Sequence, residues 1–304
     1  MTVMLSARSH VAVRANATDL LLYVVMTIVW GSTYFFTAIA LRSFAPMTLV
    51  CARMTIAAVV LFTMVRLRRI PLPGRRISLQ LFVFGLCNVA LPFTLLAIAQ
   101  THLPSALTSV LVATTPAFTF LIAGFVLRSE TVTLNRTAGI ALAFVGIVVM
   151  HPPHISGGWT WSLVVLATTL LFALGNISTR RFLTNIDPLM IAAGQVTAGA
   201  LATVPMAILE GQPTKHPSWI SVVALAELGL FASALCYSLY FRSIQRLGST
   251  ATSFSTFLQP LIGLALGVGI LGETITAQQW AAVGAVIAGL GLFLSSASRM
   301  CHRR

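Results

Sequence analysis

Two charged side chains lie inside long apolar runs, where a charge is energetically costly and therefore informative. Arg53 follows Pro46 by seven residues and Glu227 follows Trp219 by eight. At 1.5 Å per helical residue, both charges lie about 10–12 Å along their helices. A charge at such a depth in hydrocarbon costs about 3 kcal/mol or more unless it is paired or hydrated. These residues are therefore candidates for ion pairing or proton uptake.

Three interpretations of these two residues stay open. Arg53 and Glu227 could pair in one conformation and separate in another. Arg53 could instead meet the carboxylate of a bound solute while Glu227 gains and loses a proton. In the third interpretation both are structural: Arg53 caps neighbouring carbonyls and Glu227 hydrogen-bonds across helices.

Aromatic, amide and hydroxyl side chains accompany these charges on other apolar runs. Rings with a few fixed polar groups are typical of a pocket for an amphipathic small molecule. The aromatic candidates are Trp30, Tyr34, Phe93, Tyr237, Tyr240, Phe254 and Phe257. The amide candidates are Asn88, Gln100, Asn176 and Gln259. The hydroxyl candidates are Thr114, Thr115, Ser253 and Thr256. Each ring could alternatively face lipid, and each hydroxyl could satisfy backbone locally.

Two prolines lie midway along apolar runs that carry these hydroxyls. Pro116 and Pro260 each lack an N–H and clash with the carbonyl four residues earlier, which frees the carbonyls of Val112 and Thr256. A freed carbonyl in hydrocarbon needs a partner unless it faces a wet cavity. The pattern predicts kinked helices that could serve as gates at symmetric depth.

The sequence also repeats itself. Pro116 recurs as Pro260 and Glu130 as Glu273, at offsets of 144 and 143 residues. The glycine pairs Gly31–Gly175 and Gly146–Gly289 have the same offsets. If each half has five membrane spans, the second half must insert upside down relative to the first. Inverted repeats of this kind are typical of carriers that open to either side of a bilayer.

Composition indicates an all-α membrane protein with ten transmembrane helices. The chain is 57% hydrophobic and 8% charged, with a mean hydropathy of +0.93, so a soluble domain is excluded. Most of the apolar segments approach the roughly 20 residues that span hydrocarbon. They fall at about 20–41, 46–65, 79–99, 105–127, 137–151, 161–177, 188–209, 219–241, 250–271 and 278–296.

The basic residues predict the orientation. With a cytoplasmic N-terminus, sixteen of the nineteen Lys and Arg residues fall on the cytoplasmic side. Arg42 and Lys215 fall outside, and Arg53 lies within a span. This is the positive-inside distribution, and it places both termini in the cytoplasm. Because the arginines are scattered among short loops, nucleic-acid binding is not expected.

These boundaries predict five regions. Residues 1–19 form a cytoplasmic segment, 20–151 the first repeat with spans 1–5, and 152–160 an external linker. Residues 161–296 form the second repeat with spans 6–10, and 297–304 a cytoplasmic tail.

The sequence shows none of the signatures of an enzyme or a metalloprotein. All six histidines lie at or outside span ends, and no cysteine pair has metal-ligand spacing. A Walker loop for ATP is also lacking. We expect no cofactor, no bound metal and no catalytic activity. Glu130 and Glu273 are expected to tie span ends to loop backbone N–H groups.

Several short motifs resemble the EamA-type family of the drug/metabolite transporter superfamily. They are Trp30-Gly31-Ser32, Arg53, Pro116 with the Glu130-Thr131 exit, and Pro260 with Leu271-Gly272-Glu273-Thr274. The resemblance covers Leu20 to Ser296. It implies a ten-helix inverted repeat whose spans one, three, four, six, eight and nine line a central cavity. It also implies export of amino acids or related metabolites across a bacterial inner membrane.

The function expected is therefore a secondary carrier of small organic metabolites, with amino acids as the leading class. Exporters of drugs, nucleobases or other metabolites with the same fold are the alternative, and a channel or lipid flippase is the alternative of another class. Membrane lipids are expected neighbours, and the chain should be a monomer or weak homodimer. Coupling to protons or to the solute gradient alone both stay open.

Overall fold

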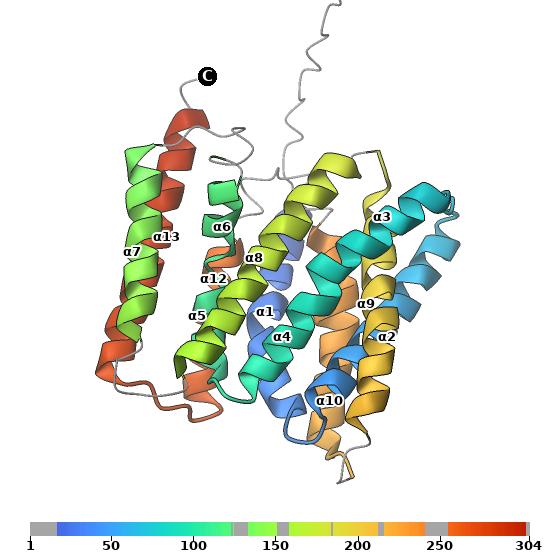
Figure 1. Cartoon of the computed structure of the whole chain (residues 1–304), viewed down its shortest axis with the longest axis horizontal. Coiled ribbons are helices and arrows are strands. Elements are labelled where there is room, and N and C mark those ends of the chain that lie inside the picture. The colour runs from blue at the N-terminus through green and yellow to red at the C-terminus, as the bar shows by residue number, and fades with distance from the viewer. Residues whose placement is uncertain are drawn as a thin grey trace, which may run out of the picture.

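A computed structural model of the chain describes residues 17–122, 124, 133–150, 158–183, 185–211, 216–240 and 255–301. Every regular element in these ranges is a helix, as predicted (Figure 1). The apolar composition explains this result, because backbone N–H and C=O groups in hydrocarbon must pair within their own segment.

Helices of the first half match the predicted apolar segments. The rod formed by α3, η1 and α4 is continuous, and η1 is π-helical. The elements are α1 (Ala17–Ala40), α2 (Pro46–Leu67), α3 (Arg75–Gly85), η1 (Leu86–Ala90), α4 (Leu91–Gln100), α5 (Ser105–Val112), α6 (Thr115–Leu121) and α7 (Leu134–Met150).

The second half follows the same order. A π-helical stretch again interrupts its third long helix, at a place equivalent to η1. The elements are α8 (Gly158–Phe182), α9 (Pro188–Glu210), α10 (Trp219–Glu227), η3 (Leu228–Leu235), α12 (Ser255–Gly269) and α13 (Ala277–Cys301).

Six helices in the described ranges are long and apolar enough to cross a membrane. They are Leu21–Ala40, Pro46–Leu67, Arg75–Gln100, Trp159–Thr179, Pro188–Glu210 and Trp219–Tyr240. Shorter apolar helices cover Ser105–Leu121, Thr137–Val149 and Leu258–Gly269. All of them fall on predicted segments, whereas the total of ten spans stays a prediction. The first turn of α1 and the last turn of α13 lie at the same end of the bundle (Figure 1).

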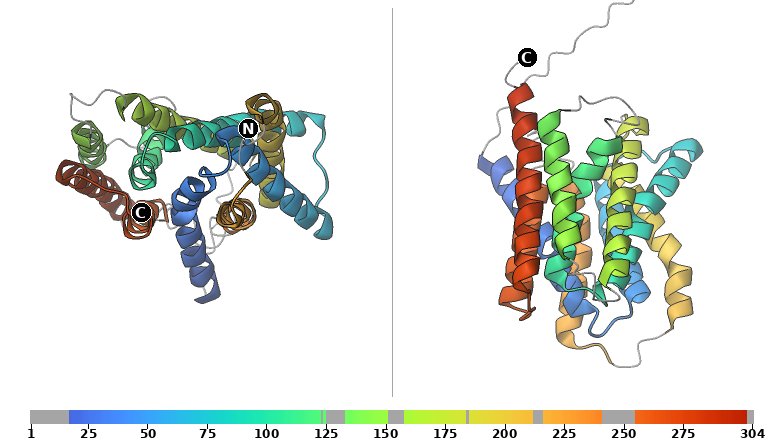
Figure 2. Two further views of the ribbon diagram at one scale, coloured as in Figure 1. Left: turned by 90° about the horizontal axis from the view of Figure 1, so that it is seen from below. Right: turned by 60° about the vertical axis from the view of Figure 1, so that its left-hand side comes forward.

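The repeated glycines of α7 and α13 pack against each other's helix. A Cβ on Gly146 would lie 2.8 Å from the carbonyl oxygen of Ala282. A Cβ on Gly289 would lie 2.5 Å from the carbonyl oxygen of Gly139 and 2.6 Å from the nitrogen of Ala143. Residue numbers rise along one helix as they fall along the other, so the pair runs antiparallel (Figure 2). Reciprocal contacts of this kind arise when a two-fold relation connects two packed segments.

The other glycine pair also marks close helix approaches. A Cβ on Gly31 in α1 would lie 2.7 Å from Cβ of Ile262 in α12. A Cβ on Gly175 in α8 would lie 2.6 Å from Cβ of Asn88 in η1. Small residues permit such approaches between membrane helices, where apolar burial gives no driving force. They bring together the helices that surround the cavity described next.

Candidate functional site

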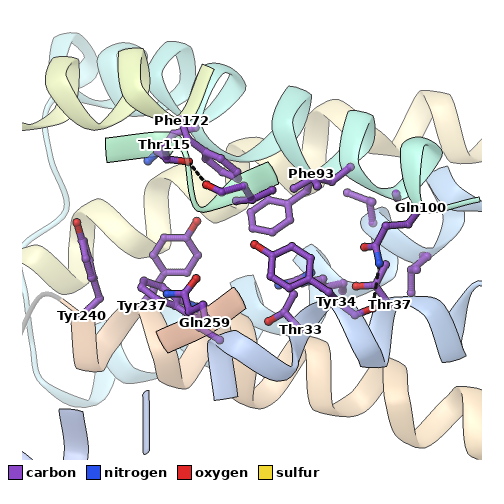
Figure 3. Close-up of a pocket in the computed structure, with 18 of the residues that line it drawn as sticks. Thr33, Tyr34, Thr37, Phe93, Gln100, Thr115, Phe172, Tyr237, Tyr240 and Gln259 are labelled. Carbon is purple, nitrogen blue, oxygen red and sulfur yellow. Dashed lines mark hydrogen bonds between the residues drawn. The ribbon is translucent and has the colours of Figure 1, made fainter. Parts of the chain in front are cut away.

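A cavity of about 190 Å³ lies among helices of both halves (Figure 3). Its size restricts an occupant to a small molecule, and its walls are mostly apolar with a few polar groups. Eleven of the predicted site residues line it: Trp30, Tyr34, Arg53, Asn88, Phe93, Gln100, Thr115, Asn176, Tyr237, Tyr240 and Gln259. They come from α1, α2, η1, α4, α6, α8, the helical residues 236–240 that follow η3, and α12. Helix α2 also lines the cavity, through Leu49, Val50 and Arg53, although it is not among the six spans that the family resemblance implied.

Arg53 is the buried cation of this cavity, with only 4% of its surface exposed. Its Nε donates to the hydroxyl of Ser233 at 2.8 Å, and its guanidinium carbon lies 4.5 Å from the ring centre of Phe93. Ser233 is the only hydrogen-bond partner of this guanidinium among the described residues. The four N–H bonds of the two Nη atoms are therefore available to a ligand.

Trp30 and two tyrosines form an aromatic cluster at the other end of the cavity from Gln100. The Trp30 ring lies 6.1 Å from that of Tyr237 and 5.2 Å from that of Tyr240. Trp30 Nε1 donates to the carbonyl of Ala232 at 2.9 Å, inside η3. Because a π-helix shifts the backbone pairing, it can leave a carbonyl for such a bond. The indole is thereby fixed in the cavity wall.

The opposite end of the cavity is lined by packed polar residues. Tyr34, Thr37 and Gln100 are at most 9% exposed. Gln100 Nε2 donates to the backbone carbonyl of Tyr34 at 2.9 Å (Figure 3). This bond ties the end of α4 to α1.

Asn88 is held in the wall by a chain of side-chain hydrogen bonds. Its Nδ2 donates to Gln195 Oε1 at 2.9 Å, and Gln195 Nε2 donates to Thr179 Oγ1 at 2.7 Å. The chain connects η1, α9 and α8. Buried amides need partners of this kind, because an unpaired one carries its full desolvation cost.

Some predicted site residues are not brought to the cavity. Thr114 is fully buried, and its hydroxyl donates to the carbonyl of Leu111 at 2.7 Å. It satisfies backbone of its own segment and does not line the cavity, so the structure does not support the predicted substrate contact. Thr115 also satisfies backbone, donating to the Val112 carbonyl at 2.7 Å, although it does line the cavity. Ser253 and the side chain of Thr256 lie outside the described residues.

The two prolines behave differently from each other. Pro116 follows the break between α5 and α6, as predicted for a kink. The carbonyl of Val112 that it frees is the acceptor of the Thr115 hydroxyl. Pro260 lies inside α12, which continues as a helix on both sides of it, so the two prolines differ in their local structure and their role as paired gates stays a prediction. Neither proline lines the cavity.

Glu227 lies beside the cavity without lining it. Its Oε2 is buried with no hydrogen-bond partner in the described residues. Arg53 attracts it electrostatically, but the two do not form a direct ion pair within the described part of the chain. The pairing hypothesis therefore does not describe this conformation.

Sequence reasoning missed several contributors. Thr33, Thr37 and Phe172 line the cavity, and Gln195 and Ser233 hold lining residues from behind. All of them except Gln195 lie in an apolar run that already contains a candidate. Helical spacing from Trp30 and Tyr34 could have indicated Thr33 and Thr37, whereas nothing local to the sequence identifies Gln195 as the partner of Asn88.

Comparisons with known proteins cover both halves of the chain. The model of the EamA-like transporter family matches residues 18–151 and again residues 159–296. The chain is 26% identical to the uncharacterized inner membrane transporter YedA of Escherichia coli strain K12, over 86% of this chain and 85% of that protein. It is 25% identical to a probable amino-acid metabolite efflux pump of Salmonella typhimurium, over 91% and 94% of the two chains.

Two further comparisons concern a named transporter and a solved structure. An S-adenosylmethionine/S-adenosylhomocysteine transporter of Chlamydia trachomatis serovar L2 is 27% identical, over 87% of this chain and 85% of that protein. A chain of known crystal structure superposes with a TM-score of 0.67 at 17% identity, over 94% of this chain and 99% of that chain. At that identity the superposition shows the fold alone.

Proposed function

This chain belongs to the EamA-like transporter family, and we propose that it is a secondary carrier. It would export small organic metabolites, with amino acids as the leading class, across a bacterial inner membrane. The observation that carries the substrate class is Arg53, a buried cation whose Nη atoms have no acceptor among the described residues. General metabolite transport accords with the relatives named above, two of which are named for moving metabolites.

The guanidinium of Arg53 is the proposed anchor for a carboxylate. Its planar fork can donate two parallel N–H···O bonds to such a group, and charge-assisted bonds of this kind are about twice as strong as neutral ones. The Phe93 ring and the Ser233 hydroxyl hold the guanidinium in place before the ligand arrives. A bound carboxylate would also offset the cost of the buried positive charge.

The aromatic cluster supplies the proposed site for the rest of the molecule. Trp30, Tyr237 and Tyr240 offer ring faces and edges to an apolar or aromatic side chain. Their faces also attract a cation, which suits the ammonium group of an amino acid. The structure thus favours amphipathic amino acids over sugar phosphates, which would call for several buried cations.

Alternating access through inverted repeats is the proposed mechanism. It is supported by the antiparallel packing of α7 and α13, in which Gly146 and Gly289 each contact the other's helix. It is also supported by the π-helical stretches at equivalent places in the two halves. We propose ten spans with both termini in the cytoplasm, in which the two halves rock about the cavity. Glu227, half-buried and with a buried Oε2 that has no hydrogen-bond partner among the described residues, is the proposed proton carrier.

A ligand panel tests this proposal. The purified protein would be heated with amino acids, nucleobases or cationic drugs, because a ligand that binds only the folded state raises the melting temperature by mass action. We expect stabilisation by amphipathic amino acids and saturable uptake of the same compounds into proteoliposomes. Stabilisation by cationic drugs alone would contradict a carboxylate site, and non-saturable flux would indicate a channel.

A further inference from the structure

The hydrogen bonds that hold the amide side chains of the cavity wall determine which of their polar atoms can bind a ligand. An amide side chain has one acceptor oxygen and one NH2 group, so using the NH2 on the protein turns the oxygen elsewhere. Gln100 uses its NH2 on the backbone carbonyl of Tyr34, which can only accept. Its Oε1 is therefore left for the cavity.

Asn88 is likewise oriented, with its NH2 group bound to the protein, by residues that do not line the cavity. Gln195 is 2% exposed and donates through Nε2 to Thr179. Its Oε1 is left to accept from Asn88 Nδ2 at 2.9 Å. Asn88 Oδ1 has no hydrogen-bond partner in the described residues, although the residue is only 6% exposed and lines the cavity. The wall thus presents a second acceptor.

The backbone of Asn88 is also fixed in place. A Cβ on Gly175 in α8 would lie 2.6 Å from Cβ of Asn88, so η1 and α8 are in close contact at this point. Along the rod that contains α4, Asn88 is five residues from Phe93 and Gln100 is seven. At 1.5 Å per residue, Asn88 is about 7.5 Å and Gln100 about 10.5 Å along the axis from Phe93, whose ring contacts the Arg53 guanidinium. Asn88 is the nearer acceptor.

We infer that Gln195 is a positioning residue for substrate selection: the Thr179–Gln195–Asn88 chain presents Asn88 Oδ1 to a hydrogen-bond donor on the substrate while Arg53 holds its carboxylate. The substrate class is then a zwitterion, an α-amino acid, rather than any amphipathic carboxylate. A bound ligand without an N–H would cover Oδ1 and leave it unpaired, and sites built around such a bond discriminate strongly against analogues that lack it. This inference rests on the proposed function, because it concerns the same cavity.

The test compares two ligands that differ only in the ammonium group. Affinities of the purified full-length protein for L-phenylalanine and for 3-phenylpropionate would be measured by calorimetric titration. We expect the wild type to prefer phenylalanine by about tenfold or more, the effect of one unpaired buried polar group. Equal affinities would overturn the inference and leave the carrier proposal standing. Binding of neither compound would overturn both.

Variants of Gln195 separate positioning from simple packing. Gln195→Glu keeps an acceptor opposite Asn88 Nδ2, so it should retain the preference for phenylalanine. Gln195→Met removes the acceptor at similar volume, so the preference should fall to within about threefold, with 3-phenylpropionate affinity little changed. If Gln195→Met does not fold, Thr179→Val tests the same chain, because it removes the acceptor of Gln195 Nε2. The preference for phenylalanine should fall in this variant too. A preference that persists in these variants, or that is lost equally in Gln195→Glu, would overturn the inference.

Discussion

The carboxylate of Glu273 binds the start of α5, 168 residues earlier in the chain. Its Oε1 accepts from the backbone N–H and the hydroxyl of Ser105, both at 2.7 Å, and its Oε2 accepts from the N–H of Ala106 at 2.9 Å. The first N–H groups of a helix have no partner within it, and a negative charge there also suits the helix dipole. This bond confirms the structural role predicted for Glu273, whereas Glu130 lies outside the described residues.

Removing the Glu273 cap should destabilise the fold. Glu273→Ala leaves two backbone N–H groups of α5 without an acceptor, which costs about 1–2 kcal/mol. The melting temperature of the purified protein should fall by about 2–4 °C for each kcal/mol. Glu210→Ala is the matched control, because Glu210 caps α2 through the N–H groups of Met47 and Thr48 at an exposed site. An equal or larger loss in that control would show that the Glu273 bond is not special.

The packing of α7 on α13 predicts opposite outcomes for two glycines of the same helix. Gly289→Ala should cost about 1–3 kcal/mol, because the new methyl group would meet backbone atoms of Gly139 and Ala143 and force the helices apart. Gly284→Ala should be neutral or slightly stabilising, since nothing lies within 4 Å of its Cβ position and alanine favours a helix. Chemical denaturation in detergent measures both. Similar stabilities for the two variants would contradict the close antiparallel packing.

The proposed role of Glu227 as proton carrier predicts how transport responds to a proton gradient. Glu227→Gln removes the ionisable group and keeps nearly the same shape. We expect this variant to move substrate down its own gradient and to lose any acceleration by a proton gradient across proteoliposomes. The carboxylate Glu210, exposed at the end of α9, provides the control Glu210→Gln, which should respond as the wild type does. If Glu227→Gln keeps the wild-type response, Glu227 does not carry the coupled proton.

Much of the site could be predicted because polar groups stand out in apolar helices. Arg53, Asn88 and Tyr237 were identifiable from their residue types alone, since lipid tolerates none of them without a partner or a cavity. The repeated glycines were identifiable from their constant offset, and they do mark close contacts. Five spans in each half, and with them the inverted relation of the halves, stay predictions that the antiparallel packing of α7 and α13 supports.

The remaining features depend on tertiary contacts that local sequence does not encode. Gln195 and Thr179 are far apart in sequence from Asn88, and a run of apolar helix gives no sign of which polar residues meet. Thr114 has the residue type of a ligand contact, yet the carbonyl of Leu111 is a nearer acceptor for its hydroxyl. Pro260 shows that a proline can be accommodated inside a membrane helix when neighbouring segments support it.

The central claim is that Arg53 anchors the carboxylate of a small metabolite in the cavity, and one measurement tests it most directly. Uptake of labelled L-phenylalanine into proteoliposomes would be compared among the wild type, Arg53→Gln and Arg66→Gln, the last an exposed arginine at the end of α2. Loss of two charge-assisted bonds, worth about 1.5–3 kcal/mol each, predicts at least a tenfold fall in uptake at low substrate for Arg53→Gln alone. If Arg53→Gln, still folded, transports phenylalanine as well as Arg66→Gln and the wild type, Arg53 is not the anchor.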